Sequence, residues 1–221
     1  ERCKTHIEIL ERKQWFMSTR KLTDEVEKTT NEIVWYPDYM KNRLIDWAKS
    51  LDWDWVISRQ RLFATPIPVW YCGGCGELII AEEEWIPIDP KLEGPRIEKC
   101  PKCGCKYFAG EQDVMDTWMD SSITCAVHAG WPDNANWRKL FPASIHPSGT
   151  DIIRTWAYYL IVRHLALFGE KPFNSVLING MVLGSDGRKM SKSLKNYAAA
   201  PEVLSKNGAD ATRQWAAGGG A

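Results

Sequence analysis

Four cysteines have the spacing of a metal site. They form two CxxC pairs, each followed by a glycine, and 24 residues (76–99) separate the pairs. The glycines allow the backbone to turn so that its amides face the sulfurs. Four thiolates make a closed tetrahedral zinc site, which is structural because no coordination position stays open for chemistry. The predicted zinc ligands are Cys72, Cys75, Cys100 and Cys103, with Cys105 close enough to compete for a place and Cys125 expected in the core.

A second run has the composition of a phosphate-binding loop. Residues 184–193, which we call the lysine loop, are Gly-Ser-Asp-Gly-Arg-Lys-Met-Ser-Lys-Ser. Lys189 and Lys192 follow glycines and stand among small hydroxyl residues, so they could close over a polyphosphate and neutralise charge at a phosphorus centre. Most such loops are solvated basic turns. The string Lys-Met-Ser-Lys-Ser would arise by chance in a chain of this size with a probability on the order of 1 in 10,000, which favours a phosphate-binding loop over a solvated turn.

The elements around this loop follow an α/β pattern. Apolar strands are expected at 144–146 and 176–178, and they alternate with helices expected from 151 to Gly169 and from Pro201 to about 215. Short apolar strands that alternate with helices pair in parallel, so the fold class is α/β with a parallel sheet.

Between Trp70 and about Gly110 the composition changes. Glycines, prolines and the two cysteine pairs accompany an acidic belt, where six acidic residues oppose two basic ones over 81–98, a net charge of −4. We expect an inserted zinc module without a hydrophobic core of its own, in which the metal takes the place of a core. Ahead of it, a strand or two is expected within 7–17 and an amphipathic helix after Pro37.

Composition excludes several classes of protein. The chain has 221 residues, 28 Lys+Arg against 28 Asp+Glu, and seven cysteines, with 44% hydrophobic residues. This is a globular composition, and its neutral balance disfavours a general nucleic-acid binder, although residues 1–21 and 180–221 each carry a net +3. With no membrane-length apolar run and no secretory leader, we expect a cytoplasmic protein with reduced thiols and no membrane segment. Both ends look cut, so we expect a segment of a longer protein.

Several motifs together resemble one enzyme family. The lysine loop resembles the signature of class I aminoacyl-tRNA synthetases. Residues 54–61 with 65–70 resemble a segment of the valyl, isoleucyl and leucyl enzymes, and residues 113–122 resemble their amino-acid-pocket segment. Residues 149–156 and 178–183 are similar to the valyl enzymes, particularly the archaeal type. The resemblance covers nearly the whole chain and implies the C-terminal half of the catalytic domain, which is the second half of a Rossmann-like nucleotide-binding fold.

The resemblance implies a nucleotide site. Lys189 and Lys192 would be catalytic, holding the ATP phosphates and stabilising the α-phosphate while the adenylate forms. Met190 and Ser191 would shape the loop. Asn179 and Gly180 would lie beside the adenine, and Gly149 and Asp151 would approach the ribose.

The resemblance also implies substrates and partners. Trp118 and Trp156 would wall a small apolar side-chain pocket, or they are ordinary core aromatics. The family's reaction is attack of the valine carboxylate on the α-phosphorus of ATP, assisted by Mg²⁺, and then transfer of valine to tRNA(Val) by a protein expected to be monomeric. Arg59 and Arg61 would support the active site or meet tRNA, and the sequence does not separate these roles.

The sequence also departs from the family. The His-Ile-Gly-His signature is absent, as are most of the editing insertion and an anticodon-binding region. Ala64 and Lys195 stand where the family usually has glycine. Ala64 is harmless if its φ is negative, whereas Lys195 adds charge beside the ATP loop.

The resemblance also implies how the chain divides into domains. The divisions are the end of the editing insertion (1–20), a connective segment (21–69), the zinc module (70–110), the C-terminal half of the Rossmann domain with the lysine loop (111–200) and the start of a helical stem-contact region (201–221).

Two other functions compete with the valyl one. An isoleucyl-tRNA synthetase would share the same motifs and differ in the volume of the pocket at Trp118 and Trp156. A zinc-ribbon module that binds nucleic acid without chemistry would need a basic face around the cysteines, and the acidic belt at 81–98 argues against it.

We expect these 221 residues alone to be inactive, because one of the two catalytic signatures is missing. Valine-dependent ATP–pyrophosphate exchange by the isolated chain measures this directly. Robust exchange would show that the expectation is wrong.

Overall fold

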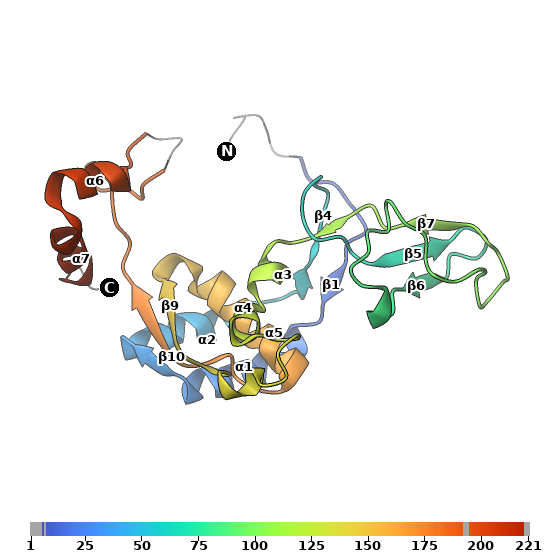
Figure 1. Cartoon of the computed structure of the whole chain (residues 1–221), viewed down its shortest axis with the longest axis horizontal. Helices are drawn as coiled ribbons and strands as arrows, with labels where there is room; N and C mark the ends of the chain where they lie inside the picture. Colours follow the sequence, from blue (N-terminus) through green and yellow to red (C-terminus); the bar gives the residue numbers. More distant parts are fainter. Residues whose placement is uncertain (1–5, 7, 192–194, 219–221) are drawn as a thin grey trace. The chain divides into compact units, whose positions relative to one another are not determined.

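Two compact units make up the computed structural model of the protein, which describes residues 6, 8–191 and 195–218 (Figure 1). Unit 1 contains the residues up to Thr19 together with Trp53–Asp120. Unit 2 contains Arg20–Asp52 together with the residues from Ser121 onward. Among the described residues, no helix combines the length and the apolar character that a membrane crossing requires.

A three-stranded parallel sheet is the centre of unit 2. Its order is β2-β10-β9, where β2 is Val34–Tyr36, β9 is Ala143–Gly149 and β10 is Phe173–Asn179. Both neighbours of β10 run parallel to it, with Leu177 opposite Tyr36 and Asn179 opposite Gly149. The predicted strands at 144–146 and 176–178 and the parallel sheet are therefore confirmed, and the two strands are longer than predicted.

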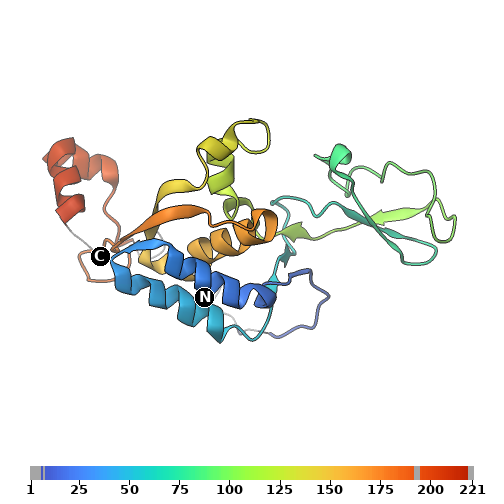
Figure 2. The ribbon, with the colours of Figure 1, turned by 90° about the horizontal axis from the view of Figure 1, so that it is seen from below.

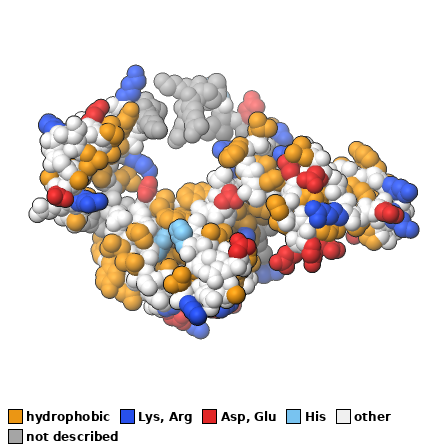
Figure 3. Space-filling view, in the orientation of Figure 1, with side chains coloured by type: hydrophobic (Ala, Val, Ile, Leu, Met, Phe, Trp, Pro, Cys, Tyr) orange, Lys and Arg blue, Asp and Glu red, His pale blue; other side chains and the backbone are white. Residues whose placement is uncertain are grey.

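The two faces of this sheet differ. Trp35, Val176 and His146 are buried on one face, as the alternation of side chains along a strand requires. Val34 and Leu177 point to the opposite face and are about half exposed, at 51% and 42%. Hydrophobic side chains gather over this part of the molecule in Figure 3. One side of the sheet thus packs into the core of unit 2, and the other presents an apolar surface.

Helices form the rest of the core of unit 2. Helices α1 and α2 lie side by side and α1 also contacts α5 (Figure 2). The expected helix after Pro37 is confirmed as α2 with a short 3-10 helix ahead of it. The helical elements here are η1 Arg20–Leu22, α1 Thr23–Glu32, η2 Asp38–Met40, α2 Lys41–Ser50, α4 Thr124–Ala129, η4 Trp137–Lys139 and α5 Tyr158–Phe168.

Two helix predictions need correction. The helix expected from 151 starts as a 3-10 helix, η5 (Thr150–Ile152), and a π-helix, η6 (Ile153–Ala157), before α5 continues to the predicted stop at Gly169. The helix expected from Pro201 is two helices, α6 (Ala200–Asn207) and α7 (Ala209–Gly218). They separate at Gly208, whose φ of 81° and ψ of 164° lie outside the helical region.

Unit 1 is built from short antiparallel strands. β1 pairs with β3, β4 pairs with β8, and the third sheet has the order β6-β5-β7. Within 7–17 the described residues contain only β1, so the second strand considered there does not form. The strands are β1 Phe16–Met17, β3 Trp55–Val56, β4 Ser58–Arg59, β5 Val69–Cys72, β6 Leu78–Ile80, β7 Phe108–Gly110 and β8 Val114–Met115.

The cysteine-rich module has a small hydrophobic core, which corrects the expectation that it has none. Trp70, Ile79, Trp85 and Ile88 are buried together, and Phe108 packs against them. The rings of Trp70 and Trp85 meet edge to face, with centroids 6.1 Å apart. A 3-10 helix, η3 (Glu83–Trp85), carries Trp85 into this core. The sequence did not predict this core because its large apolar residues have neither helical nor strand spacing.

Unit 2 buries two histidines in aromatic surroundings. The His146 ring stacks on Phe173 at 4.7 Å, and the His164 ring stacks on Phe141 at 5.4 Å. Burial lowers the pKa of both imidazoles to about 4. Between about pH 4 and the ordinary value near 6.5, the unfolded chain therefore binds more protons than the folded one. The stability that these rings contribute is present above about pH 6.5 and is lost as the pH falls towards 4.

We predict that the free energy of unfolding falls on acidification below pH 6.5 by up to about 1.4 kcal/mol per pH unit for each histidine. His164→Gln should reduce this slope, and urea titrations between pH 7.5 and 4.5 measure it. His128→Gln, at an exposed position of α4, is the control and should leave the slope as in the parent chain. Equal slopes in the parent and His164→Gln would contradict the prediction.

Candidate functional site

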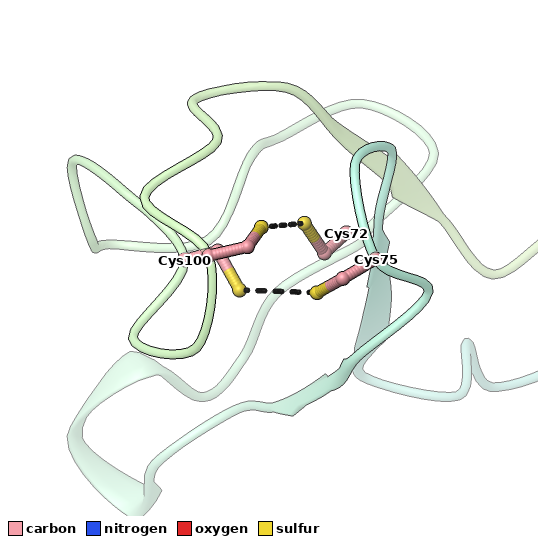
Figure 4. A group of neighbouring side chains, drawn as sticks. Cys72, Cys75 and Cys100 are labelled. Carbon is pink, nitrogen blue, oxygen red and sulfur yellow. Dashed lines mark hydrogen bonds between the residues drawn. The ribbon is translucent and has the colours of Figure 1, made fainter.

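The four predicted zinc ligands come together in unit 1. Their sulfur atoms all lie within 4.8 Å of one another. Cys72 Sγ is 3.5 Å from Cys103 Sγ, and Cys75 Sγ is 3.7 Å from Cys100 Sγ (Figure 4). In a tetrahedron with zinc–sulfur bonds of about 2.3 Å, neighbouring sulfurs are about 3.8 Å apart. The donor set and its spacing therefore fit a zinc ion with four protein ligands.

The backbone of each CxxC turn is shaped by the glycine that follows it. The N–H of Gly76 donates to Cys72 O at 2.8 Å, and the N–H of Gly104 donates to Cys100 O at 2.9 Å. Both glycines have positive φ, 73° and 75°, and both would have free space for a Cβ. Glycine is thus needed at both positions because it adopts positive φ easily, and not because a side chain would collide with its neighbours.

The surroundings of the thiols favour deprotonation of one of them. The backbone N–H of Cys75 is the main cause that lowers the pKa of the Cys72 thiol to about 6. Hydrogen bonding among the neighbouring thiols raises the pKa of Cys75 and raises that of Cys103 to about 12. Because metal binding requires thiolates, a metal bound here would displace protons from the cluster. Cys105 and Cys125 lie outside the four-sulfur cluster, and Cys125 is buried as expected.

Acidic side chains surround η3 on the surface of this module (Figure 3). Glu82, Glu83 and Glu84 are all exposed there. Lys102, between the second pair of cysteines, makes an exposed ion pair with Glu77 at 2.6 Å. The described surface near η3 therefore repels a phosphate backbone.

A second group of predicted residues meets in unit 2 at the carboxyl ends of two strands. Gly149 ends β9 and Asn179 ends β10, and the two residues stand opposite each other in the parallel ladder. Gly180 follows β10 directly, and Asp151 lies two residues after the end of β9. Ligands of parallel α/β sheets bind at the carboxyl ends of the strands. The pairing thus gathers four predicted nucleotide-binding residues at the edge where a ligand is expected.

The lysine loop reaches the same edge. Lys189 Nζ donates to Asp151 Oδ2 at 2.6 Å, and both side chains are partly exposed. The hydrogen bond from Lys189 lowers the pKa of Asp151. Lys192 lies outside the described residues. The structure therefore brings together a predicted phosphate-binding lysine and the carboxylate predicted to approach a ribose.

The segment that follows the lysine loop contains Asn196, a residue that the sequence did not point to. Asn196 accepts a hydrogen bond from the Ser191 N–H at 2.8 Å and donates to both carboxylate oxygens of Asp186. Lys195, which stands in place of a family glycine, has a φ of +53°. Ala64 has no positive φ, so its replacement of glycine needs no unusual backbone. No pattern in the sequence pointed to Asn196, because its partner at Asp186 lies ten residues away.

The two predicted pocket tryptophans belong to different units. Trp118 begins α3 (Trp118–Ser121), and its N–H donates to Asp116 Oδ1 at 3.2 Å. Trp156 lies on η6, where its indole N–H donates to Ser121 O at 3.0 Å and its ring meets His146 at 4.5 Å. Each is partly buried within its own unit. Their role in a pocket remains a prediction.

A buried carboxylate organises the start of α3. Asp116 Oδ2 accepts from Arg59 Nη2 at 2.7 Å and from the indole N–H of Trp55 at 3.2 Å. Arg59 also donates to the backbone oxygens of Val56 and Ser58. In this structure Arg59 supports its own unit, whereas Arg61 is exposed.

Glu111 is another carboxylate that the sequence did not point to. Its Oε2 accepts from the Trp15 indole N–H at 2.8 Å and from the Tyr71 hydroxyl at 2.7 Å. Burial and this carboxylate raise the pKa of Tyr71 to about 12. Glu111 thereby ties the cysteine-bearing sheet to the N-terminal segment of the same unit.

The chain matches a known protein family over almost its whole length. A family model described as tRNA synthetases class I (I, L, M and V) matches residues 4–220. The chain therefore belongs to the class I tRNA synthetases, a family that uses ATP.

Within this family, the chain is similar to curated valine–tRNA ligases of archaea. It is 58% identical to that of Methanothermobacter thermautotrophicus over 217 residues, which cover 98% of this chain and 24% of the relative. It is 54% identical to that of Methanopyrus kandleri over 220 residues, which cover 100% of this chain and 24% of the relative. The chain thus spans about a quarter of the length of these relatives.

Solved structures show the same fold. A LeuRS of Agrobacterium radiobacter, in a ternary complex with tRNA and LeuAMS, aligns with a TM-score of 0.58 at 31% identity, covering 72% of this chain and 23% of that one. Mycobacterium tuberculosis methionyl-tRNA synthetase, bound by methionyl-adenylate, aligns with a TM-score of 0.56 at 20% identity, covering 91% of this chain and 32% of that one.

We predict that the purified chain retains one zinc ion per molecule and that Cys75→Ser loses it, because three thiolates no longer close the tetrahedron. Elemental analysis after gel filtration measures the stoichiometry, and urea titration should show that metal loss destabilises unit 1. Cys105→Ser is the matched control and should keep the zinc. Loss of zinc from Cys105→Ser with retention in Cys75→Ser would contradict the ligand assignment.

Proposed function

We propose that this chain is part of a valine–tRNA ligase, which activates valine with ATP and transfers it to tRNA(Val). The observation that carries the proposal is the contact of Lys189 with Asp151 beside the paired ends of β9 and β10. A cation for phosphates and an acceptor for ribose hydroxyls stand together at the edge where parallel sheets bind nucleotides. The choice of valine is supported by the names of the curated relatives.

In the proposed reaction, a carboxylate oxygen of valine attacks the α-phosphorus of ATP. A new oxygen–phosphorus bond forms, the bond to the pyrophosphate oxygen breaks, and pyrophosphate leaves with its electron pair. Negative charge grows on the phosphate oxygens during this step. The ammonium group of Lys189 stabilises that charge, and we assign the same role to Lys192, so catalysis rests on position and electrostatics.

The nucleotide itself rearranges the charges at the site. Before ATP binds, Lys189 and Asp151 satisfy each other. ATP offers phosphates to the lysine and ribose hydroxyls to the carboxylate, so each group exchanges one partner for another. A Cβ on Gly149 would lie 2.8 Å from Asp151 Oδ1, so glycine keeps this carboxylate accessible. Asn179 and Gly180 are exposed beside it, where we place the adenine, while Met190 and Ser191 shape the loop.

The metals have separate roles in this proposal. Zinc would be held by the four cysteines and would stabilise unit 1 without taking part in the chemistry. Mg²⁺ bound with ATP would supply positive charge to its phosphates. We assign no residue of this chain to Mg²⁺.

We keep Trp118 and Trp156 as the residues assigned to recognition of the valine side chain. A hydrophobic pocket separates valine from its near-isostere threonine by only about a hundredfold, a case for which valine enzymes are themselves the reference example, so editing accompanies this chemistry. An isoleucyl enzyme is the alternative, and exchange assays with each amino acid on the intact enzyme decide between them. A nucleic-acid-binding zinc ribbon without chemistry is disfavoured by the exposed glutamates around η3.

We predict that Lys189→Ala in the intact enzyme lowers kcat for valine-dependent ATP–pyrophosphate exchange by about 10²- to 10³-fold, because a charge-stabilising donor is lost. Lys206→Ala, at an exposed position of α6, is the matched control and should retain the activity of the parent. Equal exchange rates in the parent and Lys189→Ala would refute the proposed role of the lysine.

A further inference from the structure

One side chain joins several parts of the lysine loop. Asn196 Nδ2 donates to Asp186 Oδ1 at 3.0 Å, to Asp186 Oδ2 at 3.1 Å and to Lys189 O at 3.3 Å. Its Oδ1 accepts from the Ser191 N–H at 2.8 Å. Asp186 Oδ1 also accepts from the Arg188 N–H at 3.1 Å. A single amide thus connects the turn of the loop with the backbone on both sides of Met190.

The turn of the loop is built to receive this amide. The N–H of Gly184 donates to Arg188 O at 2.8 Å, and the N–H of Gly187 donates to Gly184 O at 2.9 Å, so residues 184–188 fold back on themselves. A Cβ on Gly184 would lie 2.4 Å from Asn196 O and 3.0 Å from Asn196 Nδ2. Real Cβ atoms do not approach backbone so closely, so the absence of a side chain at Gly184 admits Asn196.

The backbone just before Asn196 takes an uncommon conformation. Lys195 has a φ of +53°, which is left-handed, and it is the sole non-glycine with positive φ among the described residues. Left-handed residues occur in turns and at helix ends, and are uncommon for residues other than glycine. Here the left-handed residue directly precedes Asn196, whose side chain bonds back to Asp186. Strain at a non-glycine residue persists only where the surroundings hold it, and the four contacts of Asn196 are those surroundings.

The same amide is linked to the proposed nucleotide site. Asn196 holds the backbone oxygen of Lys189, while the ammonium group of Lys189 reaches Asp151. We propose that Asn196, through its hydrogen bonds to Asp186, Lys189 and Ser191, which we call the clasp, is a positioning residue that fixes residues 186–191 so that Lys189 faces the ATP phosphates. This inference rests on the proposed function for its catalytic consequence, while the clasp itself is tested without any activity.

The first test measures the clasp in the free protein. Trypsin cleavage after Arg188 and Lys189, followed by mass spectrometry, reports how often the loop opens. We expect Asn196→Ala to accelerate cleavage there by about 10-fold, as the loss of several hydrogen bonds predicts. Asn207→Ala is the matched control, because Asn207 donates only within α6, to Val203 O, among the contacts described for it. Equal cleavage of the parent and Asn196→Ala would overturn the clasp.

Exchanging the amide and the carboxylate between positions 186 and 196 distinguishes loss of this specific contact from general destabilisation of the loop. Asn196→Asp places two carboxylates against each other and should open the loop as Asn196→Ala does. Combining it with Asp186→Asn restores an amide–carboxylate pair, so the double variant should regain most of the protection. Failure of the double variant to improve on Asn196→Asp would show that the two residues do not act as a pair.

The backbone at 195 gives an independent check. Lys195→Gly and Lys195→Val both remove the charge and the tryptic site at this position, and they differ in their tolerance of positive φ. We expect Lys195→Gly to protect the bonds after Arg188 and Lys189 as the parent does, and Lys195→Val to expose them. Equal behaviour of the two variants would overturn the argument from the left-handed backbone.

The catalytic consequence is read on the intact enzyme. Asn196→Ala should lower kcat for ATP–pyrophosphate exchange by about 10-fold or more and leave KM for valine unchanged, with partial recovery in the double variant. Loss of thermal stability without a change in kcat would overturn the positioning role. If the parent enzyme itself shows no valine-dependent exchange, the proposed function fails, while the proteolysis result still decides the clasp.

Discussion

The parallel pairing of β9 and β10 is the constraint on which the rest of unit 2 depends. Once six residues of each strand are in register, the chain leaves both strands at one edge, with Asn179 beside Gly149. The η5 turn begins directly after β9, and the lysine loop begins at Gly184, shortly after the end of β10. Because the ladder is made by backbone groups, this convergence survives changes in most side chains, and the chemistry is decided by the few residues at the edge.

Unit 1 is stabilised by different interactions. Its strands are two to four residues long, too short to hold together by pairing alone. Strand β5 contributes Cys72 to the four thiols and Trp70 to a small hydrophobic core. The buried carboxylate of Asp116 and the partly buried carboxylate of Glu111 join the remaining segments. Neither the metal site nor the core is large, and together they replace a single hydrophobic interior.

Sequence reasoning succeeded where a pattern is local. The CxxC pairs, the apolar strands and the stop at Gly169 all follow from a few adjacent residues. It failed where distant residues meet: Lys189 and Asp151 were predicted separately, but their contact spans 38 positions. The core around Trp70 escaped because its members have no regular spacing, and Asn196 escaped because an amide carries no signal until its partner at 186 is placed. The π-helical start of α5 has the same residue types as an ordinary helix.

The division into two units has a consequence for synthesis on the ribosome. Every residue of unit 1 precedes position 121, whereas the sheet of unit 2 needs β10, whose Ser175 pairs with Val34 across 141 positions (175 minus 34). Closing so long a loop is slow compared with forming local contacts. Unit 1 can therefore emerge and fold before helices α1 and α2 have a sheet to pack against. During this interval the apolar residues of β2 are unpaired, which leaves this short strand open to misassociation as the nascent chain grows.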